Sequence, residues 1–520
     1  MIKSIINRIL YFKQKYLTDK QFVFILSIVT GLIAGLLAVS MKNLVHYLQY
    51  LIFNYDFQKL TLSVTPIIGI IITIILAKRV FKVKTGHGIP KVLYAISRKN
   101  GALGRKSLLS SGLLSVITVG FGGSAGLEGP SASAGATIGS LTGRSFQLEF
   151  KQLIILIGCG SSAAIAAIFN TPIAAILFSL EILMLDLTIS SIIPLLISSI
   201  TGLAVSYFFL GRAAIYSLPG LLDYNMNQIP IFIILGIIAG LNAAIFSKIY
   251  LSTERIFKNF GSIYKRIIIG GIILFGLFYF FPATWGEGYE IINRCIANDS
   301  GFINDTFIFT DYYREIQLIV LLFLTFIIKT LVTNITFGIG GVGGIFAPSL
   351  FLGAVTGLMA SRILILLGFT EIHTAVIVLV AMSGFMTGIL HAPLTGIFLV
   401  VEITNGHGLI VPLIITSIIA YLISKKIIKH SVYNFELAER NLLFTHDKNR
   451  SILAKIDLRA IIEKDFQTLL PDDTILMLIE KIKKTKRNVF PVVDSENFLI
   501  GIITLEDAKK YIFKPKHFKI

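Results

Sequence analysis

The sequence predicts an all-α, polytopic membrane protein that is made of two related halves and followed by a small soluble domain. Of its 520 residues, 54% are hydrophobic and only 15% are charged, and the mean hydropathy is +0.80. A soluble globular protein of this length does not need so much apolar surface, so most of the chain is expected to lie in a membrane. Segments of the two halves also match each other, and after Ser424 the sequence becomes polar, basic and poor in glycine.

The apolar runs predict helices that are tilted or interrupted rather than uniform spans. Several runs are shorter than the roughly 20 residues that a straight helix needs to cross a bilayer, and many contain Gly or Pro. A helix that stops inside the bilayer is tolerated only where protein or water satisfies the freed backbone groups. The runs include 22–41, 62–77, 108–120, 153–168, 189–210, 230–250, 265–281, 316–337 and 373–404.

The net charge of +18 is concentrated next to the apolar runs. Lysines and arginines precede the first run and follow the last, and an excess of these residues marks the cytoplasmic ends of spans. We therefore expect a multi-pass protein of the cell (inner) membrane with both termini in the cytoplasm, beginning with a basic helix at 1–20 rather than a cleavable signal. No basic patch is interleaved with aromatic residues in the soluble region, so no nucleic-acid partner is expected. Cys159 and Cys295 have the spacing of neither a disulfide framework nor a metal site.

The membrane region repeats itself, with halves at about 21–210 and 230–425. Several matches in the same order along both halves are stronger evidence for an internal repeat than a single match between small residues. Broken helices at corresponding positions of two halves indicate a transport site near the bilayer midplane. The sequence alone leaves open whether the halves run parallel or inverted. The matching segments are 31–38 with 236–243, 129–144 with 347–362, and 170–182 with 391–403.

Three glycine-rich motifs end in a proline: GHGIP at 86–90, GLEGP at 126–130 and GIFAP at 344–348. Glycine lets the backbone turn tightly and approach a ligand, and proline is favoured in the first turn of a helix. The first N–H groups of such a helix lack partners and carry partial positive charge. Several of these helix ends together would form a pocket for a small anion without any lysine.

Glu128 is an acidic side chain at the expected depth of the membrane, where an ionisable group is costly and usually faces a protein interior or a water-filled path. When ionised, its carboxylate can occupy the anion pocket and block it; when protonated or displaced, it opens the path. The alternative is a helix-capping acid, and the membrane depth favours the gate. Glu181 and Glu402 end two matching apolar runs, and we expect them to face water or to make a structural hydrogen bond.

These motifs in this order, with a downstream tyrosine, resemble the CLC family of chloride channels and proton/chloride exchangers, whose consensus forms are GSGIP, G(K/R)EGP and GxFxP. The resemblance covers the whole membrane region. It implies the CLC fold of inverted-topology repeats with tilted and broken helices, and a homodimer with one anion pathway per subunit. It also implies that Glu128 is the gating glutamate. The positions carried over as chloride-binding are His87, Gly88, Ile345, Phe346 and Tyr433, and those carried over as structural are Gly86, Pro90, Gly126, Gly129, Pro130, Gly344 and Pro348.

Three positions depart from the family pattern. His87 replaces an anion-coordinating serine, so either its side chain or the backbone alone serves the anion there, and Leu127 replaces a basic residue. Ile182 stands where the exchangers carry an internal proton-relay glutamate, and isoleucine cannot accept a proton. We therefore expect transport of chloride or another small anion that is channel-like or weakly coupled to protons. A strictly coupled proton/chloride antiporter is the alternative.

The C-terminal region resembles a single CBS module. We expect a membrane domain at 21–430, a linker at 431–450 and a small cytoplasmic α/β domain at 451–520. Thr504 and Asp507 match positions that hold an adenosine ribose in some CBS pairs, so an adenine nucleotide is a candidate ligand, although no cofactor is required.

Three further function classes are less well supported. Charged residues other than Glu128 are absent from the motif loops, which disfavours a transporter of larger organic solutes. A membrane-anchored nucleotide sensor with a vestigial path is a further alternative. The soluble region has no Ser–His–Asp order, metal-ligand cluster or P-loop, so neither an enzyme nor a metal site is expected.

Overall fold

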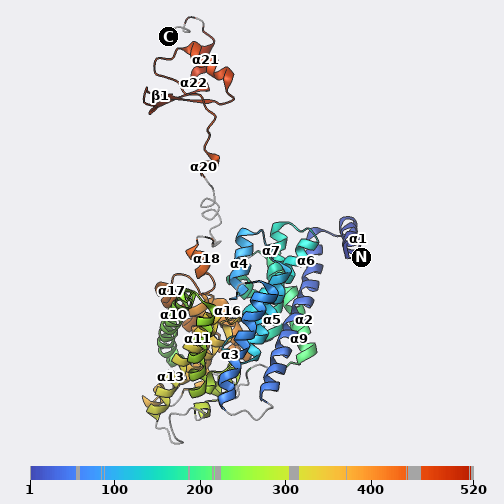
Figure 1. The fold of residues 1–520 in the computed structure, drawn as a ribbon, viewed down its shortest axis with the longest axis vertical. Helices are drawn as coiled ribbons and strands as arrows, with labels where there is room; N and C mark the ends of the chain where they lie inside the picture. Colours follow the sequence, from blue (N-terminus) through green and yellow to red (C-terminus); the bar gives the residue numbers. More distant parts are fainter. Residues whose placement is uncertain are drawn as a thin grey trace. The chain divides into compact units, whose positions relative to one another are not determined.

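The computed structural model describes residues 2–53, 59–83, 85–86, 88–185, 188–212, 216, 224–303, 315–369, 372–440, 442, 458–514 and 516. The chain separates into two compact units, Met1–His446 and Asp447–Ile520. The first unit is a helical bundle and the second is a small domain with two strands (Figure 1).

Within the described residues, nine helices are long and apolar enough to span a membrane. Shorter apolar helices lie between them, as expected from the interrupted runs. The helices of the first half are α1 (Ile2–Tyr16), α2 (Asp19–Phe53), α3 (Lys59–Ile75) with its π-helical continuation η1 (Leu76–Phe81), α4 (Gly88–Arg98), α5 (Arg105–Gly120), α6 (Glu128–Ser145), α7 (Phe150–Phe169), α8 (Pro172–Glu181) and α9 (Ile189–Leu210). Those that follow are η2 (Met226–Gln228), α10 (Ile229–Asn259), α11 (Ile263–Phe280), η3 (Pro282–Thr284), α12 (Tyr289–Ile296), η4 (Gly301–Ile303), α13 (Glu315–Ile339), α14 (Phe346–Leu366), α15 (Thr374–Leu390), α16 (Pro393–Thr404), η5 (His407–Leu409), α17 (Ile410–Ile427) and α18 (Phe435–Glu439).

The two halves use the same helix pairings. In the first half α6 packs on α7, α2 packs on α9 and α3 packs on α5; in the second half α14 packs on α15, α10 on α17 and α11 on α13. The repeat that the sequence predicts is therefore a structural repeat.

Matching glycines allow the closest of these pairings. A Cβ at Gly135 of α6 would lie 2.1 Å from the backbone oxygen of Gly160 in α7, and a Cβ at Gly353 of α14 would lie 2.5 Å from the Cα of Met382 in α15. Small residues let helix backbones approach closely. Close packing matters in a membrane because lipid tails are as apolar as the side chains, so apolar burial alone does not hold two helices together.

Reciprocal carboxylate caps join the halves. Glu181, the last residue of α8, accepts hydrogen bonds from the backbone N–H groups of Leu394 (3.0 Å) and Thr395 (2.8 Å) at the start of α16. Glu402, near the end of α16, accepts from the N–H groups of Ile173 (3.0 Å) and Ala174 (2.8 Å) at the start of α8. The C-terminal end of each helix therefore lies at the N-terminal end of its counterpart. Corresponding helices run antiparallel, which is the inverted topology.

The second unit is a two-stranded antiparallel sheet with helices against it. It comprises α20 (Leu458–Ile461), α21 (Ile475–Lys484), β1 (Val489–Val493), β2 (Leu499–Thr504) and α22 (Leu505–Ile512). Its core contains Leu469, Leu478, Phe490 and Ala508. The α/β character expected of this domain is confirmed.

The stretch just after residue 430, which the sequence predicts to begin a linker, packs on the first unit where the structure describes it. Val432, Tyr433 and Leu437 are buried in the core of that unit. Their apolar surface explains why this stretch packs on the membrane unit although its sequence is more polar than the spans. The domain boundaries proposed from the sequence stay predictions.

Candidate functional site

The GLEGP and GIFAP loops, which belong to different halves, meet backbone to backbone. The N–H of Gly126 donates to the carbonyl of Gly344 (2.8 Å), and the N–H of Gly344 donates to the carbonyl of Gly126 (2.7 Å). The glycines permit this approach, because a Cβ at Gly344 would lie 2.8 Å from the backbone nitrogen of Gly129. The two motifs therefore form one structure.

Each motif leads into a helix that begins within it. Helix α6 begins at Glu128, α14 at Phe346 and α4 at Gly88, so each proline is in the first turn, as predicted. The side chains of the N-cap residues, Leu127 of α6 and Ile345 of α14, make no hydrogen bond to the helix ends. Their first backbone N–H groups are therefore candidate donors for an anion, with the positive end of the helix dipole behind them.

The carboxylate of Glu128 lies at these helix ends. The residue has no exposed surface, and its carboxylate faces the backbone amide groups of Glu128 itself and of Ala347 in the first turn of α14. The side chain also lies against the Gly126–Gly344 bridge, since a Cβ at Gly126 would be 2.0 Å from Oε2 of Glu128. Glu128 is therefore not remote from the GIFAP motif but part of the same site.

Tyr433 and Phe346 complete the surroundings. Tyr433 is 1% exposed, its hydroxyl faces the backbone amide of Ile345, and this oxygen would be 3.4 Å from a Cβ at Gly129. The ring of Phe346 packs against Phe178, with 5.5 Å between ring centroids. The structure thus brings together four of the proposed site residues: Glu128, Ile345, Phe346 and Tyr433.

The first motif is adjacent to α6. A Cβ at Gly88 would lie 2.4 Å from the Cβ of Ser133, so α4 begins directly against α6. His87 lies outside the described residues. Leu127 is 2% exposed and Ile182 is 3% exposed. Ile182 follows the last residue of α8 as its C-cap, and no proton-accepting side chain stands at that position.

Sequence reasoning missed a segment of polar residues beside Glu128. The N–H of Leu127 donates to Oε1 of Glu287 (3.2 Å), so this acid touches the residue that precedes Glu128. Lys329 has no exposed surface, and its ammonium donates to the carbonyls of Thr284 (2.9 Å) and Gly286 (2.8 Å). A lysine in the middle of an apolar run is the signal that could have revealed this segment, by the logic applied to Glu128.

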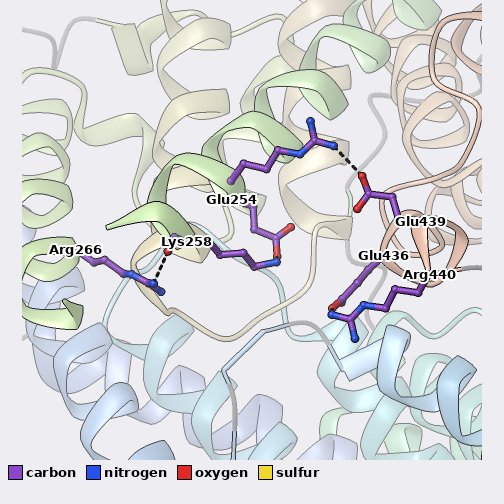
Figure 2. A network of polar contacts seen from close by, with 7 residues as sticks. Glu254, Lys258, Arg266, Glu436, Glu439 and Arg440 are labelled. Atoms are coloured by element: carbon purple, nitrogen blue, oxygen red, sulfur yellow. Dashed lines mark hydrogen bonds and ion pairs between the residues drawn. The ribbon is translucent and has the colours of Figure 1, made fainter. Parts of the chain in front are cut away.

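A cavity of about 620 Å³ lies beside the first motif, and Gly86 and Pro90 are among its lining residues. Six basic side chains and three acidic ones line it: Lys91, Lys99, Arg255, Lys258, Arg266, Arg440, Glu254, Glu436 and Glu439. Each acid is bound to a base, in the ion pairs Glu254–Lys258, Glu436–Arg440 and Glu439–Arg255 (Figure 2). The surplus of positive charge makes the cavity attractive to anions.

The family model described as voltage-gated chloride channel matches residues 68–425, which is more than half of the chain. The chain belongs to the voltage-gated chloride channel (CLC) family. A ClcB-like protein of Ralstonia nicotianae, whose name describes a chloride channel, is 28% identical over 358 residues, covering 68% of this chain and 79% of the relative. The resemblance read from the three motifs is therefore confirmed.

Solved CLC structures share the fold. A slow cyanobacterial Cl⁻/H⁺ antiporter superposes with a TM-score of 0.70 and 24% identity, over 82% of this chain and 99% of the antiporter chain. A CLC-type fluoride/proton antiporter superposes with a TM-score of 0.65 and 23% identity, over 79% and 97%. The CLC fold class with its tilted and broken helices is confirmed.

The CBS domain model matches residues 458–514 of this CLC protein. Thr504 is the N-cap of α22 and forms a capping box with Asp507, whose N–H donates to the Thr504 hydroxyl (3.2 Å). Hydrogen bonds from the side chain and then the backbone of Thr504 lower the pKa of the Asp507 carboxyl, so it is ionised at neutral pH. The two residues predicted to hold a ribose therefore lie side by side.

Proposed function

We propose that this CLC protein carries chloride or another small anion across the cell membrane through a pathway gated by Glu128. One observation carries the proposal: the Glu128 carboxylate faces the N-terminal turn of α14 where the loops of the two halves join, beside Tyr433. A carboxylate that faces the donors of an anion site competes with the anion for them.

The donors of this pathway are backbone groups. The amide groups of Ile345 and Phe346, the hydroxyl of Tyr433 and the start of α4 at Gly88 would hold the anion. Helix dipoles attract an anion without a fixed cation at the site, so the anion can also leave. The cavity beside Gly86 would be the cytoplasmic entrance, with both termini on that side, and its surplus of basic side chains would concentrate anions there.

Coupling to protons is expected to be absent or weak. Ile182 is buried and apolar, and the neighbouring Glu181 is occupied as the cap of α16. A strictly coupled antiporter is the second candidate, because the solved structures that share the fold are described as antiporters of chloride or fluoride with protons.

Flux measured in liposomes would separate the candidates. With an outward chloride gradient and no imposed proton gradient, we expect chloride efflux without proton uptake. External chloride and internal pH would be recorded together, with protein-free liposomes as the blank. Uphill proton uptake in fixed ratio to chloride would establish the antiporter and contradict the channel-like mechanism.

The assembly is expected to be a homodimer with one complete pathway in each subunit. The helices α8, α9, α16 and α17 carry large apolar side chains at the protein surface. Examples are Ile173, Ile200, Leu394, Ile418 and Leu422. These exposed side chains need either lipid or a second subunit, and the family resemblance favours a partner across this face.

The CBS domain is expected to bind an adenine nucleotide through Thr504 and Asp507, either within one chain or across the dimer. Calorimetry of the full-length protein with ATP or AMP should show saturable heat that Asp507→Asn abolishes. Asp473→Asn is the matched control, because Asp473 binds Lys481 in the same domain (2.6 Å) and lies outside the predicted ribose site. Equal nucleotide binding by wild type and Asp507→Asn would exclude this role.

A further inference from the structure

Tyr289, the first residue of α12, contacts the gate directly. Its hydroxyl donates a hydrogen bond to Oε1 of Glu128 at 2.5 Å, across 161 positions of sequence. The acceptor belongs to the side chain that would have to move for the pathway to open. A group that binds the closed form of a gate and not its open form shifts the balance between them.

The segment before Tyr289 is held in place on three sides. Lys329 bonds two of its carbonyls and lies 4.7 Å from the centre of the Phe351 ring. The N–H of Gly286 donates to the carbonyl of Gly122 (2.9 Å). Gly288 has a φ of +85°, and a Cβ there would lie 2.4 Å from the Phe351 ring. The hydroxyl of Tyr289 is therefore presented to Glu128 by a fixed backbone rather than by a free loop.

We propose that Tyr289 is a latch that holds the ionised Glu128 carboxylate in its blocking position. This inference rests on the proposed function, in which Glu128 is the gate. A hydrogen bond to an ionised acceptor is roughly twice as strong as one between neutral groups. The latch is therefore strong when Glu128 is charged and weak once it is protonated. Tyr289 is a positioning residue, since it acts through Glu128 rather than on the anion.

Other charged or titratable groups face the same carboxylate. Lys42 of α2 also donates to the carbonyl of Ile168 (3.0 Å), and Tyr216 has its ring 6.2 Å from that of Tyr289. Among the described residues, Tyr289 is the one whose side chain is seen to donate a hydrogen bond to Glu128. Tyr289 and Lys42 are the side chains that act on the Glu128 carboxylate. The charge of Glu128 in turn acts on Tyr216, Glu287 and Tyr433, and Lys329 acts on Glu287.

The test is the pH profile of anion flux in liposomes for Tyr289→Phe. Removing the hydroxyl takes one hydrogen bond from the ionised carboxylate, so protonation and opening should occur at higher pH. We expect the pH of half-maximal flux to rise by roughly one unit, with flux up to about tenfold higher above the midpoint. The matched control is Tyr216→Phe, which removes a buried neighbouring hydroxyl that makes no hydrogen bond to Glu128 among the described contacts. Its profile should follow that of wild type.

A second background makes the result specific. In Glu128→Gln protein the further change Tyr289→Phe should alter neither the rate nor the pH profile, because the latch acts only through Glu128. A Tyr289→Phe profile that superimposes on wild type, or an effect that persists in the Glu128→Gln background, would overturn the latch. If Glu128→Gln flattens the profile while Tyr289→Phe leaves it unchanged, the gate stands and the latch falls. If Glu128→Gln itself keeps the wild-type profile, gate and latch both fall.

Discussion

Replacing Glu128 by glutamine should give anion flux that is fast and independent of pH. The amide cannot ionise, so it does not compete with the anion for the helix N-termini, and its side chain mimics the protonated gate. Wild-type flux should fall roughly tenfold for each pH unit above the midpoint of gate protonation, whereas the variant should keep the rate of the open state. Chloride efflux from liposomes between pH 5 and pH 8 measures both.

Glu290→Gln is the matched control for this experiment. Glu290 is an exposed acid of α12 that pairs with Arg294 at 2.7 Å, so the same chemical change there should leave the profile unaltered. Retention of the wild-type pH dependence in Glu128→Gln would remove this side chain from the mechanism.

Replacing Glu181 by alanine should destabilise the membrane unit. The carboxylate accepts bonds from two backbone N–H groups and from the Thr395 hydroxyl (2.7 Å) at the start of α16. Without it, these donors lose an ionised acceptor at a half-buried helix end. We expect a loss of roughly 2 to 3 kcal/mol in the free energy of unfolding, seen as a lower melting temperature in detergent. Glu402→Ala should act similarly at the start of α8.

Glu149→Ala provides the comparison for that loss. Glu149 is exposed at the start of α7 and makes no capping hydrogen bond with its side chain, so its removal should leave the melting temperature close to wild type. Glu181→Gln, which keeps a single acceptor oxygen, should fall in between. If Glu181→Ala has the same melting temperature as Glu149→Ala, the reciprocal caps contribute no net stability.

Local rules were sufficient to predict the helix starts and the burial of Glu128 beside them. Pro130 and Pro348 lie in the first turns of α6 and α14 because proline at a helix start loses no intrahelical hydrogen bond. Placing Glu128 at the site followed from the cost of an acid at membrane depth. Both inferences use only a residue and its near neighbours in sequence.

Contacts between distant segments could not be predicted in the same way. The match of Glu181 with Glu402 marks a repeat, but only the inverted arrangement shows that each caps the helix of the other. Tyr289 belongs to no motif, and its meeting with Glu128 depends on the turn at Gly288 and on the clamp formed by Lys329. Such contacts require the fold: Lys329 stands out as a charge in an apolar run, but nothing near it in the sequence shows that it binds the segment before Tyr289 or that Tyr289 meets Glu128.

The backbone bridge between Gly126 and Gly344 limits how the protein can move. If one half rocked against the other, the two main-chain hydrogen bonds of this bridge would have to break in the buried interior, far from replacement partners in water. Access to the two sides of the membrane is therefore expected to alternate through changes of side-chain rotamers. The backbone of the two halves would stay fixed as one rigid body. A covalent cross-link between the halves, placed away from the side chains that rotate, would then leave anion transport intact.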